Sequence, residues 1–170
     1  GDRRERLGLR QDAFVVMYAG KLDETKGGKF LAESLRAPFA SPPDRPVEFL
    51  VIGNSDGDYG AQGESVLAAS ASKIVRLPTQ RYFDLAQYYQ AADMAVFPRQ
   101  CSMSFFEAQS SGLPVLFERN EINNQRAAHE NAFVFAPGNE AELRSRIEWL
   151  ASLAPRQLGQ LRADARNLVL

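Results

Sequence analysis

Side chains that could bind a nucleotide are concentrated in one short segment, between Arg99 and Glu107. An apolar run precedes this segment and a helical pattern follows it, so the loop lies where a parallel strand ends and a helix begins. Ligands of open parallel sheets bind at such strand ends, and the start of a helix favours a phosphate. Glu107 lies about one turn inside the helix and could accept hydrogen bonds from sugar hydroxyls. The loop begins with Gln100, Cys101, Ser102, Met103 and Ser104.

Two lysines follow the first apolar run of the chain. Gly20 and Lys21 come directly after it, and Lys26 stands just before the next helical pattern. A glycine at a strand end permits close approach of backbone or ligand, and a lysine supplies a compact positive charge. Lys21 and Lys26 could therefore flank the same phosphate, although a solvated loop whose lysines point into water is an equal alternative.

A third strand end is marked by Gly53, which precedes a segment rich in glycine and aspartate at 54–60. The segment lacks the closing glutamate and the ligand spacing of an EF-hand calcium loop. It also lacks the G-x-G-x-x-G spacing of a dinucleotide fingerprint. We predict a turn here, with Gly53 kept small where a ligand or a neighbouring backbone approaches, and we assign no metal.

Short apolar runs alternate with amphipathic stretches from one end of the chain to the other. Six runs have the composition of strands buried on both faces, at 13–19, 47–52, 74–77, 94–97, 114–117 and 132–135. Seven stretches have helical periodicity, at 28–36, 63–70, 83–92, 103–111, 122–128, 140–153 and 155–169. With right-handed crossovers, this alternation predicts a three-layer, Rossmann-like α/β domain with a central parallel sheet of about six strands.

The composition is that of a single globular domain. The chain has 170 residues, 45% of them hydrophobic and 24% charged, which is enough to bury a core. A formal charge of −1 gives no electrostatic attraction to nucleic acid or to acidic membranes. One cysteine excludes an internal disulfide, and the sequence contains no signal peptide or membrane-length apolar run. We expect a cytoplasmic protein, and both ends of the chain suggest cuts through something longer.

The order of four motifs resembles glycosyltransferase family 4. The motifs are Gly20-Lys21 with Lys26-Gly27, then VIG at 51–53, YYQAADMAVFP at 88–98 and FEAQSSGLPV at 106–115. Over about residues 6–153 the chain is similar to the carboxyl-terminal, nucleotide-sugar-binding half of a retaining GT-B glycosyltransferase. The resemblance implies transfer of a hexosyl group to a glycan or lipid-linked acceptor, which would bind an amino-terminal domain absent from this chain. It also implies that the full-length enzyme is cytoplasmic or peripheral to the inner membrane.

The resemblance also implies roles for the motif residues. Lys21 and Lys26 match the diphosphate clamp, and Glu107 matches the glutamate that holds the ribose, so these three form the expected catalytic set. The donor would be a UDP-, GDP- or ADP-linked sugar, bound without a cofactor or a divalent metal. The remaining matched residues face the nucleobase, the distal phosphate or the donor sugar. The full predicted donor site is Gly20, Lys21, Lys26, Gly53, Leu77, Pro78, Thr79, Arg99, Cys101, Ser102, Met103, Ser104 and Glu107.

Arg99 departs from the family pattern, because a glutamate is expected eight positions before Glu107. The usual glycine-rich loop is likewise replaced by residues 100–104. The arginine could contact a phosphate or a carboxylate on the donor sugar, or it could mark a degenerate, non-catalytic nucleotide-binding or interaction domain. In either case we expect the isolated chain to catalyse nothing.

A flavodoxin-like receiver or flavin domain has the same alternation of strands and helices. The chain lacks the paired acidic residues expected after the first strand of a receiver. Lys21 and Lys26 at that position favour an anionic ligand instead.

Overall fold

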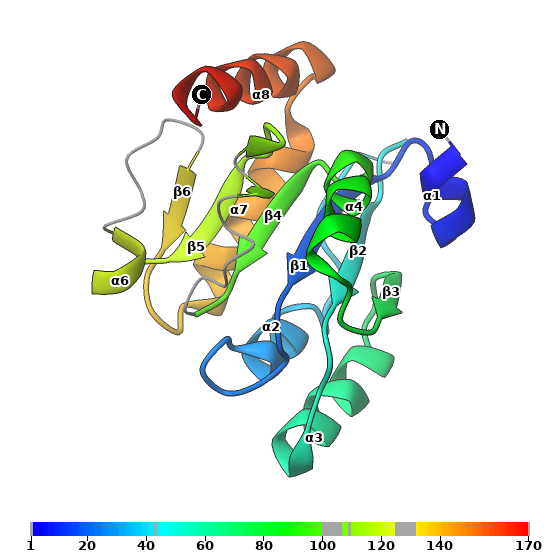
Figure 1. Ribbon diagram of the computed structural model, residues 1–170, viewed down its shortest axis with the longest axis vertical. Coiled ribbons are helices and arrows are strands. Elements are labelled where there is room, and N and C mark those ends of the chain that lie inside the picture. The colour runs from blue at the N-terminus through cyan, green and yellow to red at the C-terminus, as the bar shows by residue number, and fades with distance from the viewer. Residues whose placement is uncertain (1, 43, 100–106, 109, 125–131, 170) are drawn as a thin grey trace.

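The computed structural model describes residues 2–42, 44–99, 107–108, 110–124 and 132–169. Its centre is a six-stranded sheet in the order β3-β2-β1-β4-β5-β6 (Figure 1). The strands are β1 (Phe14–Ala19), β2 (Val47–Ile52), β3 (Ile74–Leu77), β4 (Met94–Phe97), β5 (Val115–Glu118) and β6 (Ala132–Phe135). The helices described are α1 (Asp2–Leu7), α2 (Gly28–Ser34), α3 (Gly57–Ala68), η1 (Tyr82–Asp84), α4 (Leu85–Ala91), α6 (Glu121–Asn124), α7 (Glu140–Ser152) and α8 (Pro155–Val169).

All neighbouring strands of this sheet are parallel, so their carboxyl ends lie along one edge. The chain runs outward from β1 through β2 to β3, and then returns to β4 on the other side of β1. The strand order therefore reverses between β1 and β4. Open α/β sheets bind their ligands at such a switch point.

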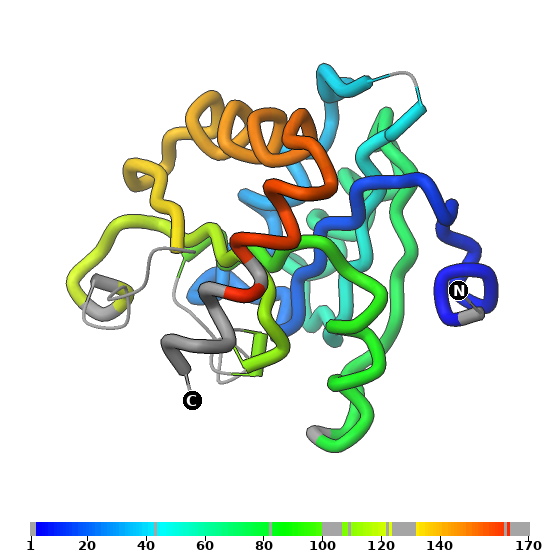
Figure 2. The backbone as a smooth tube through the Cα atoms, turned by 90° about the horizontal axis from the view of Figure 1, so that it is seen from above, coloured from blue at the N-terminus to red at the C-terminus, as the bar shows by residue number. Residues whose placement is uncertain are grey.

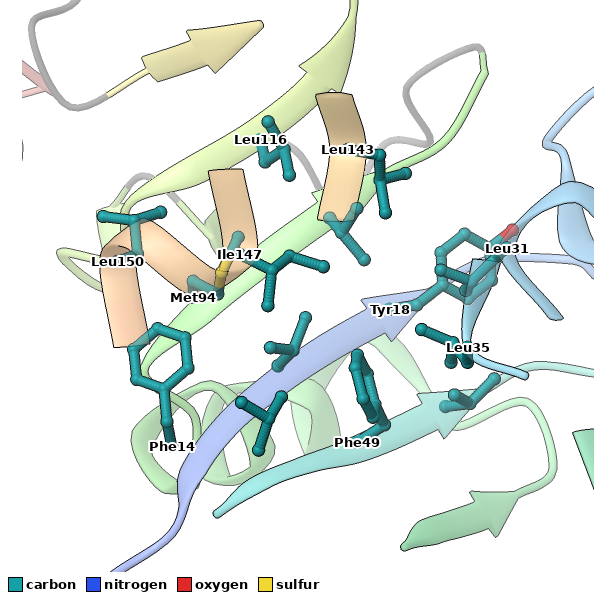
Figure 3. Packing of buried hydrophobic residues seen from close by; sticks show 14 of the residues in the cluster. Phe14, Tyr18, Leu31, Leu35, Phe49, Met94, Leu116, Leu143, Ile147 and Leu150 are labelled. Carbon is teal, nitrogen blue, oxygen red and sulfur yellow. The ribbon is translucent and has the colours of Figure 1, made fainter. Parts of the chain in front are cut away.

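Helices cover both faces of the sheet, as the sequence predicts. Alternate residues of β1 point to opposite sides, so that Val16 belongs to one apolar cluster and Met17 to the other. Figure 3 shows the first cluster, where Ile147 and Leu150 of α7 pack over the strands. The second cluster packs against α4, and Figure 2 shows α4 and α7 on opposite sides of the strands. The three-layer, Rossmann-like prediction is confirmed.

Helix α3 begins earlier than the sequence predicts, at Gly57 instead of residue 63. Gly60 serves close packing at the start of this helix, because a Cβ atom there would lie 2.9 Å from the carbonyl carbon of Ser55, which is too close for any larger residue. A Cβ atom at Gly57 would meet nothing within 4 Å, but its φ of +66° favours glycine. The predicted turn is therefore wrong over residues 57–60, which are helical.

The apolar pattern of the sequence does not predict helix α1. Polar contacts of an arginine hold this helix on the domain. Arg4 donates hydrogen bonds to the carbonyl oxygens of Gln11, Ala13 and Ala91, and to the Asp93 carboxylate at 2.9 Å. Arg4 and Asp93 keep only 14% and 16% of their side chains exposed. Hydrophobic periodicity does not detect a helix that is held by a buried ion pair.

Candidate functional site

The described residues of the predicted site lie along one edge of the sheet. Gly20 and Lys21 follow β1, Gly53 follows β2, and Arg99 follows β4. Leu77 ends β3, so Pro78 and Thr79 lie at the same edge (Figure 1). Parallel pairing therefore brings together segments that are separated by up to about eighty positions in the sequence.

The loops after β1 and β2 are in direct backbone contact. A Cβ atom on Gly53 would lie 1.7 Å from the carbonyl oxygen of Gly20, and the φ of Gly53 is +149°. The amide of Gly20 donates to the Ile52 carbonyl at 3.0 Å, and the amide of Leu22 donates to the Asn54 carbonyl at 2.9 Å. Gly53 is therefore kept small by a neighbouring backbone, which was one of the two reasons that the sequence suggested.

Lys21 lies on the surface at the mouth of this edge. Its Nζ atom is 3.3 Å from Oδ2 of Asp56, and the two side chains are 57% and 70% exposed. An exposed ion pair of this kind contributes little free energy, so Lys21 can exchange Asp56 for another anion at small cost. The backbone beneath it is fixed, because the buried Tyr18 hydroxyl donates to the Lys21 carbonyl at 2.7 Å.

Lys26 lies in a tight loop, and hydrogen bonds to Asp23 hold the loop together. The Lys26 amide donates to Oδ1 of Asp23 at 2.8 Å, and the Gly27 amide donates to the Asp23 carbonyl at 2.9 Å. Gly27 then adopts a φ of +82° and α2 begins at Gly28. We call residues 23–27 the lysine loop.

Arg99 reaches from the end of β4 to the lysine loop. Its Nη1 atom donates to the Glu24 carbonyl at 2.8 Å. Its side-chain carbons lie against Gly27, where a Cβ atom would be 2.8 Å from Cγ of Arg99. The structure thus brings together Arg99 and Lys26, two residues that the sequence assigned to the same ligand.

Asn123 is a structural residue of this edge that the sequence did not identify. It is fully buried, and its Nδ2 atom donates to the carbonyl oxygens of Arg99 and Glu118, both at 2.8 Å. Its own amide donates to Oδ1 of Asn120 at 2.8 Å. The only sequence signal was two asparagines three positions apart at a helix start, a spacing typical of an N-terminal cap.

Glu107 is half-buried on the helix that follows the loop after β4. Its Oε2 atom is buried and has no hydrogen-bond partner in the part of the chain that the structure describes. A buried carboxylate oxygen without a donor is costly, so its position favours a ligand that brings a hydroxyl or amide. Four predicted residues, Cys101, Ser102, Met103 and Ser104, lie outside the described residues.

An open depression of about 400 Å³ lies at the carboxyl ends of β2 and β3. On one wall the Arg76 guanidinium donates to both oxygens of Glu64, at 2.7 and 3.0 Å, and to the Gly53 carbonyl at 2.9 Å. The hydrogen bond from Arg76 holds the pKa of Glu64 below its usual value. The lining residues are Gly53, Asn54, Ser55, Asp56, Glu64, Arg76, Leu77 and Pro78.

Asn54 and Thr79 connect the ends of β2 and β3 beside this depression. The backbone amide of Asn54 donates to Oγ1 of Thr79, and the backbone amide of Thr79 donates to Oδ1 of the Asn54 side chain, both at 3.0 Å. The predicted nucleobase segment, Leu77 to Thr79, therefore has a defined backbone conformation before any ligand binds.

Two classes of feature are not found in the described part of the chain. No group of three or more histidine, cysteine, aspartate or glutamate side chains there could hold a metal ion. Within the same residues, no helix is both long enough and apolar enough to cross a membrane.

A family model and curated proteins match most of this chain. A family model described as "Glycosyl transferases group 1" matches residues 13–152. The D-inositol 3-phosphate glycosyltransferase of Jonesia denitrificans is 31% identical over 174 residues, which cover 96% of this chain and 41% of that protein. The relative from Thermobispora bispora is 29% identical, with coverages of 95% and 40%.

Solved structures share the fold at lower identity. Anabaena Alr3699/HepE in complex with UDP-glucose superposes with a TM-score of 0.80 at 21% identity, covering 99% of this chain and 46% of that one. WaaG, a glycosyltransferase involved in lipopolysaccharide biosynthesis, gives a TM-score of 0.75 at 20% identity, with coverages of 98% and 45%. The chain thus spans less than half the length of these relatives.

Proposed function

The chain belongs to the group 1 glycosyl transferases, and we propose that it binds the nucleotide-sugar donor at the carboxyl edge of its sheet for a retaining transfer. The observation that carries the proposal is the buried, unpartnered Oε2 atom of Glu107. A ribose hydroxyl would donate to it and remove the cost of that burial.

The diphosphate of the donor binds beside Lys21 and Lys26. Lys21 and Lys26 both belong to the connection between β1 and α2, and this connection reaches β4 through Arg99. During transfer the bond from the sugar to the diphosphate breaks, while an acceptor hydroxyl attacks the same face of the sugar. Negative charge then develops on the leaving diphosphate, and fixed positive charge at that point stabilises the transition state.

The nucleobase occupies the depression beside β3, where Leu77 and Pro78 form part of the lining. UDP is the first nucleotide to test, because the solved neighbour HepE holds UDP-glucose. A hexosyl donor is the corresponding choice of sugar. The lysine clamp replaces a divalent ion in this scheme, so donor binding should not require metal.

The acceptor, a glycan or a lipid-linked sugar, binds outside this chain. The chain covers 41% of a curated relative and 46% of a solved one, which leaves room for an amino-terminal half that supplies the acceptor site. We therefore propose that residues 1–170 form the donor half alone and transfer no sugar without that partner half. The location proposed for the complete enzyme is the cytoplasm or the inner face of the membrane.

Nucleotide titration by calorimetry tests the donor site. UDP, GDP and ADP are added to the unmodified protein and to the Lys26→Met and Glu107→Gln variants, each with magnesium and with EDTA. We expect one diphosphate to bind independently of metal, and each variant to bind it at least about tenfold more weakly, a loss of about 1.4 kcal/mol. Lys73→Met is the matched control, because Lys73 precedes β3 at the opposite edge of the sheet.

Unchanged affinity in both site variants would remove the proposed clamp. A second candidate function, a degenerate nucleotide-binding or interaction domain, is favoured by Arg99 in place of the expected glutamate. The two differ in the full-length protein. Nucleotide binding without any sugar transfer or donor hydrolysis would support the degenerate domain, whereas transfer restored by Arg99→Glu would show lost catalysis on an intact donor site.

A further inference from the structure

We propose that Arg99 is a positioning residue, which holds the lysine loop against the carboxyl ends of β4 and β5 and thereby sets the affinity for the donor diphosphate. The inference rests on the proposed function of Lys26. In this scheme Arg99 acts through the lysine loop and does not itself contact the donor.

The residues just before the lysine loop are tied to the sheet. The Tyr18 hydroxyl of β1 donates to the Lys21 carbonyl, and the Leu22 amide donates to the Asn54 carbonyl after β2. Within the loop, Asp23 accepts from the amides of Lys26 and Gly27, so these bonds shape the loop but do not attach it. On the far side, the Glu24 carbonyl accepts from Arg99. Arg99 therefore supplies the attachment on the β4 side of the switch point.

Gly27 is the residue that lets Arg99 reach this carbonyl. A Cβ atom there would lie 2.8 Å from Cγ, 3.2 Å from Cβ and 3.3 Å from Cδ of Arg99. Its φ of +82° also favours glycine over every other residue. Lys26 thus supplies a cation, and Gly27 supplies the open backbone surface on which the Arg99 side chain rests.

Arg99 is itself held from the opposite side. Asn123, fully buried, donates to the Arg99 carbonyl and to the Glu118 carbonyl through the two protons of one amide group. The ends of β4 and β5 are therefore connected through Asn123, and the end of β4 is connected to the lysine loop through Arg99. We call this connection the arginine brace.

Among the described residues, Arg99 forms no salt bridge, and its side chain donates to the neutral carbonyl of Glu24. A guanidinium suits this role because the aliphatic carbons of the side chain rest on Gly27 while one N–H of the planar fork reaches the Glu24 carbonyl. A lysine has neither the plane nor the fixed donor directions.

A double-mutant cycle tests the brace in the full-length protein. UDP affinity is measured by calorimetry for the unmodified protein, Arg99→Gln, Lys26→Met and the double variant. We expect each single variant to bind UDP about tenfold more weakly, and the double variant to be within about twofold of Lys26→Met, because coupled residues are not additive. Arg99→Lys should resemble Arg99→Gln within about threefold, since it keeps the charge and loses the planar fork.

Arg119→Gln is the matched control, because Arg119 is exposed, follows β5 at the same edge and bonds through its backbone amide. Amide hydrogen exchange gives a readout that needs no nucleotide. Exchange across residues 24–28 should be faster in Arg99→Gln than in Arg119→Gln.

Four results would overturn the inference. Additive losses in the double variant would mean that Arg99 contacts the donor directly. Equal losses of UDP affinity in Arg119→Gln and Arg99→Gln would mean that any positive charge at this edge has the same effect. Unchanged UDP affinity in Arg99→Gln, with weaker binding in Lys26→Met, would refute the brace and leave the proposed donor site intact. An unchanged affinity in Lys26→Met would instead refute the proposed function of Lys26, and the brace with it.

Discussion

The two halves of the binding edge are built in different ways. At the ends of β1 and β2, the loops touch mainly through backbone, with Gly53 against the Gly20 carbonyl. The exposed ion pair of Lys21 and Asp56 adds a side-chain contact of little free energy. At the ends of β4 and β5, the side chains of Arg99 and Asn123 span the gaps and bond to carbonyl oxygens. The first half relies on glycines that let two backbones meet, and the second relies on the polar side chains of an arginine and an asparagine.

This difference separates what each half can tolerate. A contact between backbones is destroyed by any added atom but is indifferent to the surrounding side chains. A contact made by an arginine or an asparagine survives changes in volume nearby but is lost with a single functional group. The first half should therefore fail through steric overlap, and the second through unsatisfied hydrogen bonds.

The largest effect is expected at Gly53. Gly53→Ala would place a Cβ atom 1.7 Å from the Gly20 carbonyl oxygen, so the loops after β1 and β2 must separate. We expect a loss of about 3 kcal/mol or more in the free energy of unfolding, measured by urea denaturation. Gly63→Ala is the control, because Gly63 lies inside α3 and its Cβ would be 3.8 Å from the nearest atom, Cα of Lys29 in α2; it should be neutral or stabilising by up to about 1 kcal/mol. Similar losses in both variants would refute the steric account.

The second effect compares one residue type in the two halves. Asn123→Leu keeps the volume and removes the donors to the Arg99 and Glu118 carbonyls, so we expect a loss of about 2 kcal/mol. Asn54→Ala should cost less than about 1 kcal/mol, because Asn54 is exposed and water can replace its bond to Thr79. Chemical denaturation of both variants gives the ranking, and a larger loss for Asn54→Ala would reverse the comparison.

A variant at Tyr18 tests how the end of β1 is held. Its hydroxyl is buried, which raises its pKa strongly, and it donates to the Lys21 carbonyl at 2.7 Å. Tyr18→Phe leaves that carbonyl without its partner and should lower the free energy of unfolding by about 1 kcal/mol. Tyr59→Phe is the matched control, because its hydroxyl accepts a longer bond, 3.3 Å, from the Lys29 amide. Thermal melts should show a clear shift only for the Tyr18 variant.

The smallest effect is a pH dependence at the depression beside β3. The hydrogen bond from Arg76 lowers the pKa of Glu64 below its usual 4.5, so this pair stabilises the folded state above that pH. The contribution is lost as the pH falls through the lowered pKa. Because Glu64 is 40% exposed, water screens the pair and limits its contribution to under about 1 kcal/mol.

Glu64→Gln lacks this titration. Melts at about pH 7 and about pH 3 should show the variant less stable than the unmodified protein at neutral pH, with the gap narrowing in acid. A gap that widens in acid would give the opposite sign and contradict the assignment.

The sheet was predictable because its strands are short, nearly continuous apolar runs. All six predicted strands agree to within one residue at each end: β1 begins one residue later, β5 is shifted by one residue to Val115–Glu118, and the other four have the predicted bounds. Gly53 was predictable for the same local reason, since a glycine directly after a strand signals a close approach. Helix α3 was predicted too short because Gly57 and Gly60 are typical of turns, whereas here Gly60 makes room for Ser55.

The polar contacts of the second half were not predictable from local patterns. The bond from Arg99 to Glu24 joins residues 75 positions apart, and the bond from Asn123 to Arg99 joins residues 24 positions apart. Nothing in either segment specifies its partner, because an arginine in a loop is normally solvated. The sequence identified Arg99 as unusual for its family, and the fold was needed to show what it touches.

The docking of α1 has a practical consequence for anyone who shortens this chain. Arg4 lies nine positions before the first residue of the family match, residue 13, yet its guanidinium is a nearly buried partner of Asp93. Asp93 also accepts from the Val15 amide at 2.8 Å, inside β1. A protein trimmed to the matched residues would keep this carboxylate and discard its cation, a change that typically costs about 3–5 kcal/mol. An expression boundary for this domain should therefore be placed ahead of Asp2.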